Sequence, residues 1–380
     1  MQLIQLTEEQ EMIRDMVRRL ADEQIAPIAG RIDQSGEFPQ DVVDLFEKYD
    51  LFKLKLPKKY GGLEVDSVTY YLVIEEIARV CGSSSMMIAI QGSCMTTINV
   101  GSNEEQKDRF LGKLGKGNVI MSWALTEPGA GSDVGSISTK AVLDGDNYIL
   151  NGSKCFISNG GSADLYTTFV RTSEGKGTNG LSAFIIEKDT PGFKIGKIED
   201  KLGMRGSMTS ELIFEDAKVP KENRLGEEGM GWSILTESIK ETRLGIAVQA
   251  LGIAQGALDN ATEYAKEREQ FGKPISSFQG VQFMLADMKM RVEAARALIY
   301  QVASLLDRGI RDIIPHAAMA KCFASDTAMK VTTDAVQILG GYGYMKDYPV
   351  ERMMRDAKAT QIMEGTNQIQ RVIIARSMLG

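Results

Sequence analysis

The sequence predicts an α+β protein made of three consecutive parts: helical, then β, then helical. Helical periodicity runs through residues 1–118, short β-branched and aromatic runs fill 119–226, and long helical patterns return over 227–380. At 380 residues the chain exceeds one ordinary domain of roughly 150 residues. We therefore expect an N-terminal α-helical domain, a central β domain and a C-terminal helical bundle with these bounds.

The first part opens with a helix whose start is marked by Thr7. Gln10 follows three residues later, which is the spacing of a capping box. Apolar residues then recur at helical spacing. Further helices are expected at 39–48, 67–80, 84–100 and 104–114.

The residue pattern of the middle part predicts a β-sheet. Strands are expected at 137–142, 148–150, 165–171, 181–187 and 211–214. Asp144, Gly145 and Asp146 separate the first two strands, and an Asp-Gly pair supplies the positive φ angles of a tight hairpin turn.

The last part returns to long helical patterns. Helices are expected at 232–268, 278–308, 315–339, 350–357 and 366–378. Their wide apolar faces predict either a four-helix bundle or a face buried against another subunit.

The composition excludes several classes of function. The chain has 44 Lys and Arg residues against 51 Asp and Glu, a net charge of −7, and no long basic run, which argues against nucleic acid as a partner. Its four cysteines are dispersed without a Cys-x-x-Cys pair, so we expect reduced thiols and no metal site. The single histidine, His316, excludes a mechanism that needs two imidazoles.

Signals for targeting and for common nucleotide folds are also missing. The chain shows no export signal and no stretch of about 18 apolar residues, so we expect no membrane span. The expected location is the bacterial cytoplasm, or the mitochondrial matrix if a leader has been removed. No Gly-x-Gly-x-x-Gly motif opens a βαβ unit and no P-loop occurs, which disfavours a nucleotide such as NAD bound in the Rossmann or P-loop manner.

Three stretches are not explained by periodicity alone. They are ALTEPGAGSD at 124–133, REQFG at 268–272, and QILGGYGY at 337–344, which continues through RDA at 355–357 to MEGTNQ at 363–368. The first can bring backbone N–H groups close to a flat ligand or a phosphate, although such clusters also form plain surface turns. In the second, Arg268 can clamp a diphosphate and Phe271 can pack on adenine or ribose. An exposed charge at a helix end is the other interpretation.

Glu364 is the candidate general base. Ile362, Met363 and Gly365 give it an apolar setting that would raise the pKa of its carboxyl group, as removal of a proton from a weakly acidic carbon requires. A carboxylate just before a helix that starts near Thr366 is also simply favourable to that helix.

Together, in this order and over essentially the whole chain, these motifs resemble the acyl-CoA dehydrogenase family of flavoproteins. The resemblance implies an N-terminal helical domain, a central β-barrel-like domain and a C-terminal four-helix bundle, assembled as a homotetramer. It also implies FAD bound between the domains and across a subunit interface, an acyl-CoA substrate, and electron-transfer flavoprotein as the electron acceptor.

The same resemblance implies the site residues. The loop at 124–133 would lie along the flavin, and residues 156–158 would border its ring. The implied cofactor residues are Trp123, Leu125, Thr126, Ser132, Phe156, Ile157, Ser158, Arg268, Phe271, Gln279, Gln337, Gly340, Gly341, Thr366 and Gln368. The implied substrate residues are Ser132, Lys240, Thr242, Arg243, Gly365 and Gln91.

Glu364 falls on the Glu-Gly-Thr signature of the family, which implies that it abstracts the proton α to the thioester carbonyl. Its backbone N–H and a ribitol hydroxyl of the flavin would polarise that carbonyl. Some members carry the base in the segment that matches Thr242 and Arg243. Here that position is a threonine, and Glu241 lies about 100° away around a helix, so Glu364 is the only expected base.

Departures from the family pattern leave the acyl group open. Lys240 stands where Asp is common, Met363 replaces a frequent Tyr, and the region around Gln91 is rich in methionine, which adapts to irregular shapes but is also common in plain cores. The sequence thus predicts FAD-dependent dehydrogenation of a short, branched or alicyclic acyl-CoA to the 2-enoyl-CoA. An enoyl-CoA reductase, a flavin oxidase or monooxygenase, and an inactive helical scaffold remain alternatives.

Overall fold

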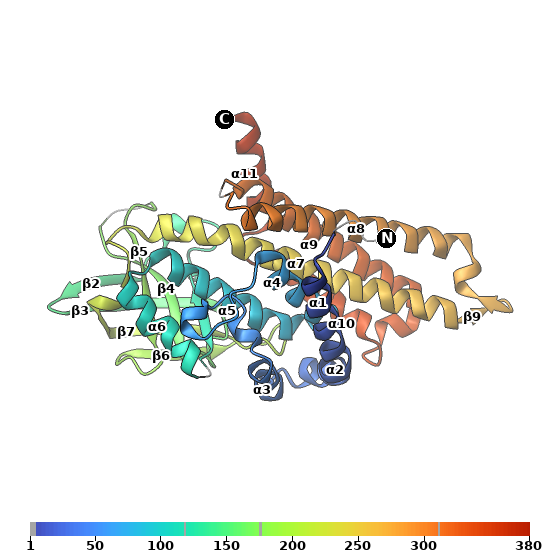
Figure 1. Ribbon diagram of the computed structural model, residues 1–380, viewed down its shortest axis with the longest axis horizontal. Coiled ribbons are helices and arrows are strands. Elements are labelled where there is room, and N and C mark those ends of the chain that lie inside the picture. The colour runs from blue at the N-terminus through green and yellow to red at the C-terminus, as the bar shows by residue number, and fades with distance from the viewer. Residues whose placement is uncertain (1–4, 118, 175–176, 311) are drawn as a thin grey trace.

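The computed structural model describes residues 5–117, 119–174, 177–310 and 312–380. The elements follow the predicted order of helices, strands and helices. Figure 1 shows the sheet at one end of an elongated molecule and the long C-terminal helices running away from it. The last helix, α11 (Asn367–Leu379), projects from the side of the molecule.

The N-terminal part is helical. Its elements are α1 Glu8–Leu20, η1 Ala21–Ile25, α2 Ala26–Ser35, α3 Gln40–Lys48, η2 Leu51–Lys53, η3 Lys58–Tyr60, α4 Ser67–Ala78, α5 Gly82–Gly101 and α6 Glu104–Lys116. The capping box predicted at Thr7 and Gln10 is present with both of its hydrogen bonds. Helix α2 was not predicted; it carries Pro27 in its first turn, where proline is well tolerated.

The described residues of the central part form one eight-stranded sheet of order β6-β7-β3-β2-β4-β5-β8, in which β1 pairs with β4. The strands are β1 Met121–Ala124, β2 Lys140–Asp144, β3 Asn147–Ser158, β4 Leu165–Arg171, β5 Leu181–Glu187, β6 Phe193–Ile198, β7 Thr209–Pro220 and β8 Arg224–Leu225. β4 runs parallel to β1 and β2, and the other pairs of this sheet are antiparallel. Packed aromatic rings give the sheet its own apolar core.

The hairpin predicted around Gly145 joins β2 to β3, with Leu143 opposite Tyr148 and Asp144 opposite Asn147. Its turn differs from the prediction in one respect. Of the loop residues, only Gly145 has a positive φ (62°), and Asp144 belongs to the strand. A glycine at the first central position is the pattern of a type II′ turn, which needs only one positive φ.

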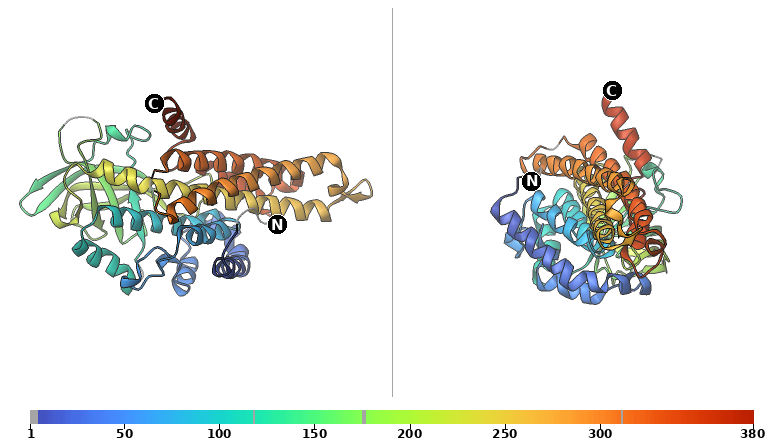
Figure 2. Two further views of the ribbon diagram at one scale, coloured as in Figure 1. Left: turned by 45° about the horizontal axis from the view of Figure 1, so that its top comes forward. Right: turned by 90° about the vertical axis from the view of Figure 1, so that its right-hand side faces the viewer.

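The C-terminal part is again helical. Its elements are α7 Gly231–Glu267, β9 Glu269–Gln270, β10 Lys273–Pro274, η6 Ile275–Ser277, α8 Gln279–Asp307, α9 Ile314–Leu339, η7 Gly340–Tyr344, α10 Pro349–Thr360 and α11. Helix α7 packs against α4, α5, α8, α9 and α10, so it forms the axis of the helical region. The end-on view in Figure 2 shows the other helices arranged around it.

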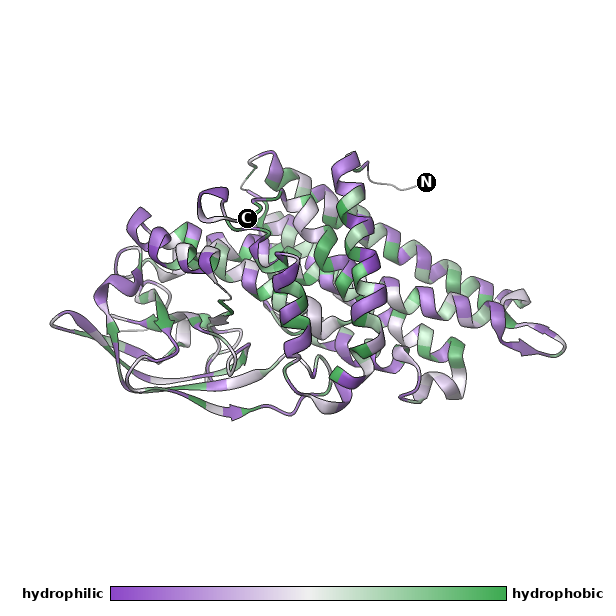
Figure 3. Ribbon diagram, turned by 60° about the horizontal axis from the view of Figure 1, so that its bottom comes forward, coloured by the Kyte–Doolittle hydropathy of each residue, from purple (hydrophilic) through white to green (hydrophobic). Residues whose placement is uncertain are grey.

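Hydrophobic segments gather where the helices lie side by side, as Figure 3 shows, and hydrophilic segments lie mostly on the outside. Helices α4 and α5 are buried on nearly all sides, because they lie against α7 and against each other. Among the described residues, none of the helices combines the length and the apolar character needed to cross a bilayer.

Candidate active site

The candidate base lies in the turn between α10 and α11. Glu364 has a left-handed backbone (φ 53°), and so has Gly365 (φ 86°). A non-glycine residue in a sparsely populated region costs on the order of 1–3 kcal/mol and persists only where its surroundings enforce it. A Cβ atom at Gly365 would lie 2.8 Å from Gln370 Nε2, so glycine suits both the space and the backbone there.

Donors from two helices hold this turn in place. Gln370 Nε2, on α11, donates to the carbonyl oxygens of Glu364 (3.1 Å) and Gly365 (2.8 Å). Lys321 Nζ, on α9, also donates to the carbonyl oxygen of Gly365 (2.9 Å). These hydrogen bonds hold Glu364 and Gly365 in their left-handed conformation.

The Glu364 carboxylate is partly buried beside polar groups of α7. Thr242 Oγ1 donates a hydrogen bond to Glu364 Oε2 (3.0 Å). Burial raises the pKa of the Glu364 carboxyl group, and Thr242, Arg243 and Lys321 oppose that rise by favouring its charged form. A partly desolvated carboxylate that can still ionise suits a general base.

The backbone N–H of Glu364 has no acceptor in the part of the chain that the structure describes. The residue thus offers a base and an unused donor together. A ligand with an acidic carbon at the carboxylate could place a neighbouring carbonyl oxygen at this N–H, where negative charge would develop.

Arg243 carries a second unused donor. Its side chain is buried (the residue is 7% exposed), and its Nε atom has no partner among the described residues. Burial lowers the pKa of its guanidinium, and Glu364 acts in the opposite direction. Leaving a buried donor unpaired is costly, so this atom indicates a place for a polar group of a ligand. Lys240, one turn earlier, instead pairs with Glu237 (2.5 Å).

The residues expected along the flavin lie on β1, on β3 and in the loop after β1. Leu125 and Ile157 are buried, whereas Ser132 is exposed. Phe156 occupies an irregular position of β3 with a positive φ (59°) and is 67% exposed. Such a ring on a strained backbone offers a flat apolar surface to a ligand. Trp123 is held by a hydrogen bond from its Nε1 to Thr97 Oγ1 (3.2 Å).

A buried ion pair lies beneath this loop. Lys154 Nζ is 2.7 Å from Glu127 Oε1, and the two side chains are 0% and 3% exposed. Lys154 also donates to the carbonyl oxygen of Leu125 (3.1 Å), and Glu127 accepts from the backbone N–H of Ser138 (2.7 Å). The pair therefore fixes the backbone on both sides of Thr126.

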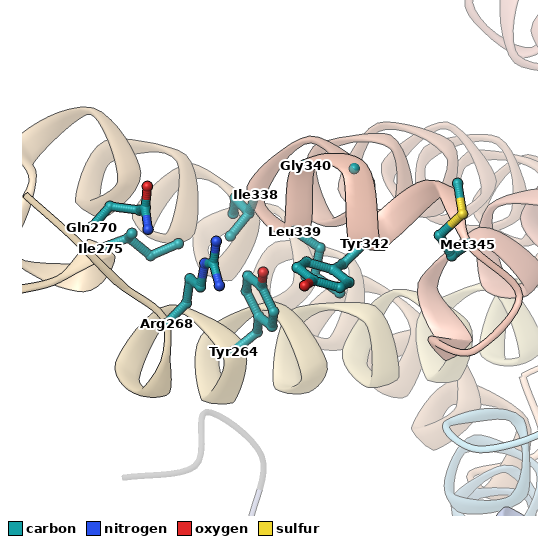
Figure 4. Close-up of a pocket in the computed structure, with 10 residues that line it drawn as sticks. Tyr264, Arg268, Gln270, Ile275, Ile338, Leu339, Gly340, Tyr342 and Met345 are labelled. Carbon is teal, nitrogen blue, oxygen red and sulfur yellow. The ribbon is translucent and has the colours of Figure 1, made fainter.

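Three of the other expected cofactor residues, Arg268, Gly340 and Gly341, line a surface pocket of about 440 Å³. Figure 4 shows Arg268 and Tyr264, from the end of α7, pointing toward Tyr342 and the other residues that follow α9. The Arg268 guanidinium lies 5.6 Å from the centre of the Tyr342 ring. A cation, aromatic rings and the side-chain-free backbone of Gly340 and Gly341 suit a diphosphate and its nucleoside.

Several expected cofactor residues are exposed around this end of the molecule. Phe271 is 93% exposed, and Gln279 and Gln337 are also exposed. At the catalytic turn, Thr366 caps α11 by accepting from a backbone N–H, and Gln368 is exposed. Their contact with a cofactor stays a prediction.

The pocket and the base are far apart within one chain. Thr242 and Arg268 are separated by roughly 26 positions along α7, or about 39 Å at 1.5 Å per residue. Figure 1 accordingly places β9, next to the pocket, at the opposite end from the sheet. The fold brings Glu364, Thr242, Arg243 and Gly365 together, but it does not bring Arg268 to them.

Gln91 has a structural role that the sequence did not suggest. Its Nε2 donates to the carbonyl oxygen of Val119 (2.8 Å), and its Oε1 accepts from the backbone N–H of Met121 (3.0 Å). Both ends of the amide thereby secure the start of β1. Contact of Gln91 with a substrate stays a prediction.

Sequence reasoning missed Lys154, Glu127, Lys321 and Gln370. Their importance depends on partners from other elements, which periodicity does not reveal. Lys321 did carry a signal, because it stands in the apolar run AMAKCFA with no acidic residue three or four positions away. A helical lysine in that setting has to find a partner outside its own helix.

Comparison with known proteins identifies the class. Family models described as the acyl-CoA dehydrogenase N-terminal, middle and C-terminal domains match residues 7–118, 122–217 and 229–379. The three-part fold is therefore that of FAD-dependent oxidoreductases, and the predicted fold class is confirmed. The chain belongs to the acyl-CoA dehydrogenase family.

Individual relatives cover nearly the whole chain. A short-chain specific acyl-CoA dehydrogenase of Clostridium acetobutylicum is 49% identical, over 97% of this chain and 98% of the relative. A cyclohex-1-ene-1-carbonyl-CoA dehydrogenase of Geobacter metallireducens is 49% identical, over 98% and 99%.

Solved structures give the same result. Butyryl-CoA dehydrogenase from Megasphaera elsdenii superposes with a TM-score of 0.96 and 43% identity, over 99% of this chain and 100% of the other. A chain solved in work on the electron transferring flavoprotein of Acidaminococcus fermentans has a TM-score of 0.96 and 49% identity, over 99% of each chain.

Proposed function

We propose that this enzyme removes hydrogen from the α and β carbons of a short, branched or alicyclic acyl-CoA thioester and gives the 2-enoyl-CoA. The observation that carries the proposal is the turn at Glu364. It combines a partly buried carboxylate of raised pKa with a backbone N–H that has no acceptor among the described residues.

Each group around the turn has a role in this reaction. Glu364 takes the α proton, and its backbone N–H donates to the thioester oxygen as charge develops there. Thr242 orients the carboxylate through its hydroxyl hydrogen bond. Arg243, with its unpaired Nε, contacts a polar group of the CoA part. The FAD of the family supplies, when bound, the acceptor for the β hydride.

The residues of the chain fit FAD at two places. On the sheet, the exposed ring of Phe156 and the loop around Thr126 offer a surface for the flavin, with Trp123, Leu125, Ser132, Ile157 and Ser158 beside them. At the pocket, Arg268 suits the diphosphate, and Gly340 and Gly341 line the same pocket. The exposed Phe271, Gln279 and Gln337 are proposed to contact the adenosine end of the cofactor.

The separation of these two places supports an oligomer. One dinucleotide does not reach across the roughly 39 Å between Thr242 and Arg268. The Arg268 pocket of one subunit therefore completes the flavin site of another, and we propose a homotetramer as in the family expectation.

The named relatives bear on the acyl group, the electron acceptor and the location of this enzyme. The named relatives act on short-chain, butyryl and cyclohexene-carbonyl thioesters, which supports a short or alicyclic acyl group. The similarity to the chain from work on an electron transferring flavoprotein supports such a protein as the electron acceptor. The relatives named here come from bacteria, which supports the bacterial alternative for location.

The test is reduction of the flavin by butyryl-CoA under anaerobic conditions. Glu364→Gln should abolish bleaching of the flavin, because the amide cannot accept the α proton. Glu263→Gln, at an exposed site on α7 that pairs with Lys266, serves as the matched control and should bleach at the wild-type rate. Bleaching of Glu364→Gln at the wild-type rate would show that the base is assigned wrongly.

A further inference from the structure

A fully buried lysine lies directly behind the catalytic turn. Lys321, on α9, is 0% exposed. Its Nζ atom donates to the carbonyl oxygen of Gly365 (2.9 Å) and to Asn367 Oδ1 (2.9 Å). The ammonium thus ties the residue after Glu364 to the first residue of α11.

The second acceptor of Lys321 is itself held rigidly. Asn367 is 3% exposed, and its Nδ2 donates to Ser325 Oγ (2.8 Å) and to Asp326 Oδ1 (2.7 Å), both on α9. The Lys321 and Asn367 side chains therefore form a hydrogen-bond network anchored on α9. This network contacts the catalytic turn at the Gly365 carbonyl oxygen.

The turn needs this support. Glu364 and Gly365 are both left-handed, and a non-glycine residue prefers to leave that region when nothing holds it. Without Lys321, Gln370 is the remaining side-chain donor to the Gly365 carbonyl among the described residues. A shift of this peptide would move the Glu364 backbone N–H and carboxylate together.

We propose that Lys321 is a positioning residue for the base. It fixes the turn so that the carboxylate and the backbone N–H of Glu364 face the same ligand, and its charge favours the ionised carboxylate. The inference rests on the proposed function of Glu364.

The charged and titratable groups around Glu364 and Lys321 come from several helices. Glu364 is faced by Arg243 on α7, Lys321 on α9 and the Cys94 thiol on α5. Lys321 is faced by Glu364, Arg243, Cys322 and Asp326. Burial lowers the pKa of Lys321 to about 8, so its ammonium is still mostly charged at neutral pH.

The experiment separates positioning from a merely structural role by the pH dependence of flavin reduction. The variants are Lys321→Met, which removes tether and charge, Lys321→Gln, which keeps a donor, and Lys321→Arg, which keeps the charge. The control is Lys330→Met, on the same helix, where the lysine is exposed and pairs with Asp334. Butyryl-CoA is the probe, and thermal unfolding is measured alongside.

We expect kcat of Lys321→Met to fall about tenfold to 100-fold with little change in KM, because the reacting groups are misplaced rather than unbound. Losing the cation raises the pKa of Glu364, so the acid limb of the rate profile moves to higher pH in the Met and Gln variants. Lys321→Arg should return the limb toward the wild-type position, and Lys330→Met should leave rate and limb unchanged.

Three results would overturn the proposal. One is an acid limb that stays in place in Lys321→Met and Lys321→Gln. Another is a wild-type rate in Lys321→Met with only a lower unfolding temperature. The third is failure of both uncharged variants to fold while Lys321→Arg is normal, which would make the role structural. If Glu364→Gln still bleaches normally, the proposed function fails; if it does not bleach and Lys321→Met is normal, only this inference fails.

Discussion

Replacing Lys154 by methionine should strongly destabilise the sheet. The substitution removes the partner of Glu127, which is 3% exposed and 2.7 Å from Lys154 Nζ. Breaking a buried ion pair from one side costs about 3–5 kcal/mol, because an uncompensated charge stays in the interior. Glu127 keeps its hydrogen bond from the Ser138 backbone N–H, so we expect a loss in the free energy of unfolding of about 3 kcal/mol.

Urea unfolding followed by circular dichroism measures this loss. The double variant with Glu127→Gln should recover part of it, because the neutral amide needs no counter-ion and can still accept from Ser138. Lys194→Met is the control, since Lys194 and Glu215 form an exposed pair in the same sheet, worth less than about 1 kcal/mol. A Lys154→Met protein within about 1 kcal/mol of wild type, or a double variant less stable than the single one, would refute this reasoning.

Two further predictions concern titration. Thr242→Val removes the hydroxyl donor that lowers the pKa of Glu364. The acid limb of the pH profile of flavin reduction should therefore move to higher pH, and kcat at acid pH should fall about tenfold. Thr242→Ser keeps the hydroxyl and should behave as wild type. Burial raises the pKa of Asp356 to about 6, so the folded protein holds a proton that the unfolded chain releases at lower pH. The stability of wild type relative to Asp356→Asn should therefore fall, by up to about 3 kcal/mol, as pH rises from about 4 to about 6, which urea melts across that range would check. Equal pH dependence of the two proteins would contradict the assignment.

Elements with strong local signals were predicted closely. The strands expected at 165–171 and 181–187 coincide with β4 and β5, because each is a buried run with little interruption. The capped start of α1 was found for a similar local reason. Strand β6 was missed, since its sequence FKIGKI is mostly exposed and interrupted by glycine, and it owes its form to pairing with β7.

The candidate site likewise contains residues that the sequence predicted and residues that it did not. Glu364, Gly365, Thr242 and Arg243 were proposed from short motifs, and the fold places them together. Lys321 was not proposed, because its acceptors lie 44 and 46 positions away along the chain. A motif identifies the group that reacts, whereas the group that holds it is defined only when distant helices meet.

The strength of the base follows from helix packing rather than from the turn alone. Burial pushes the pKa of Glu364 upward, and the opposing groups come from two helices, Thr242 and Arg243 from α7 and Lys321 from α9. Helices α7 and α9 pack against each other over much of their length. The pKa of Glu364 therefore depends on how α7 and α9 place these groups, whereas the left-handed turn positions the carboxylate beside them.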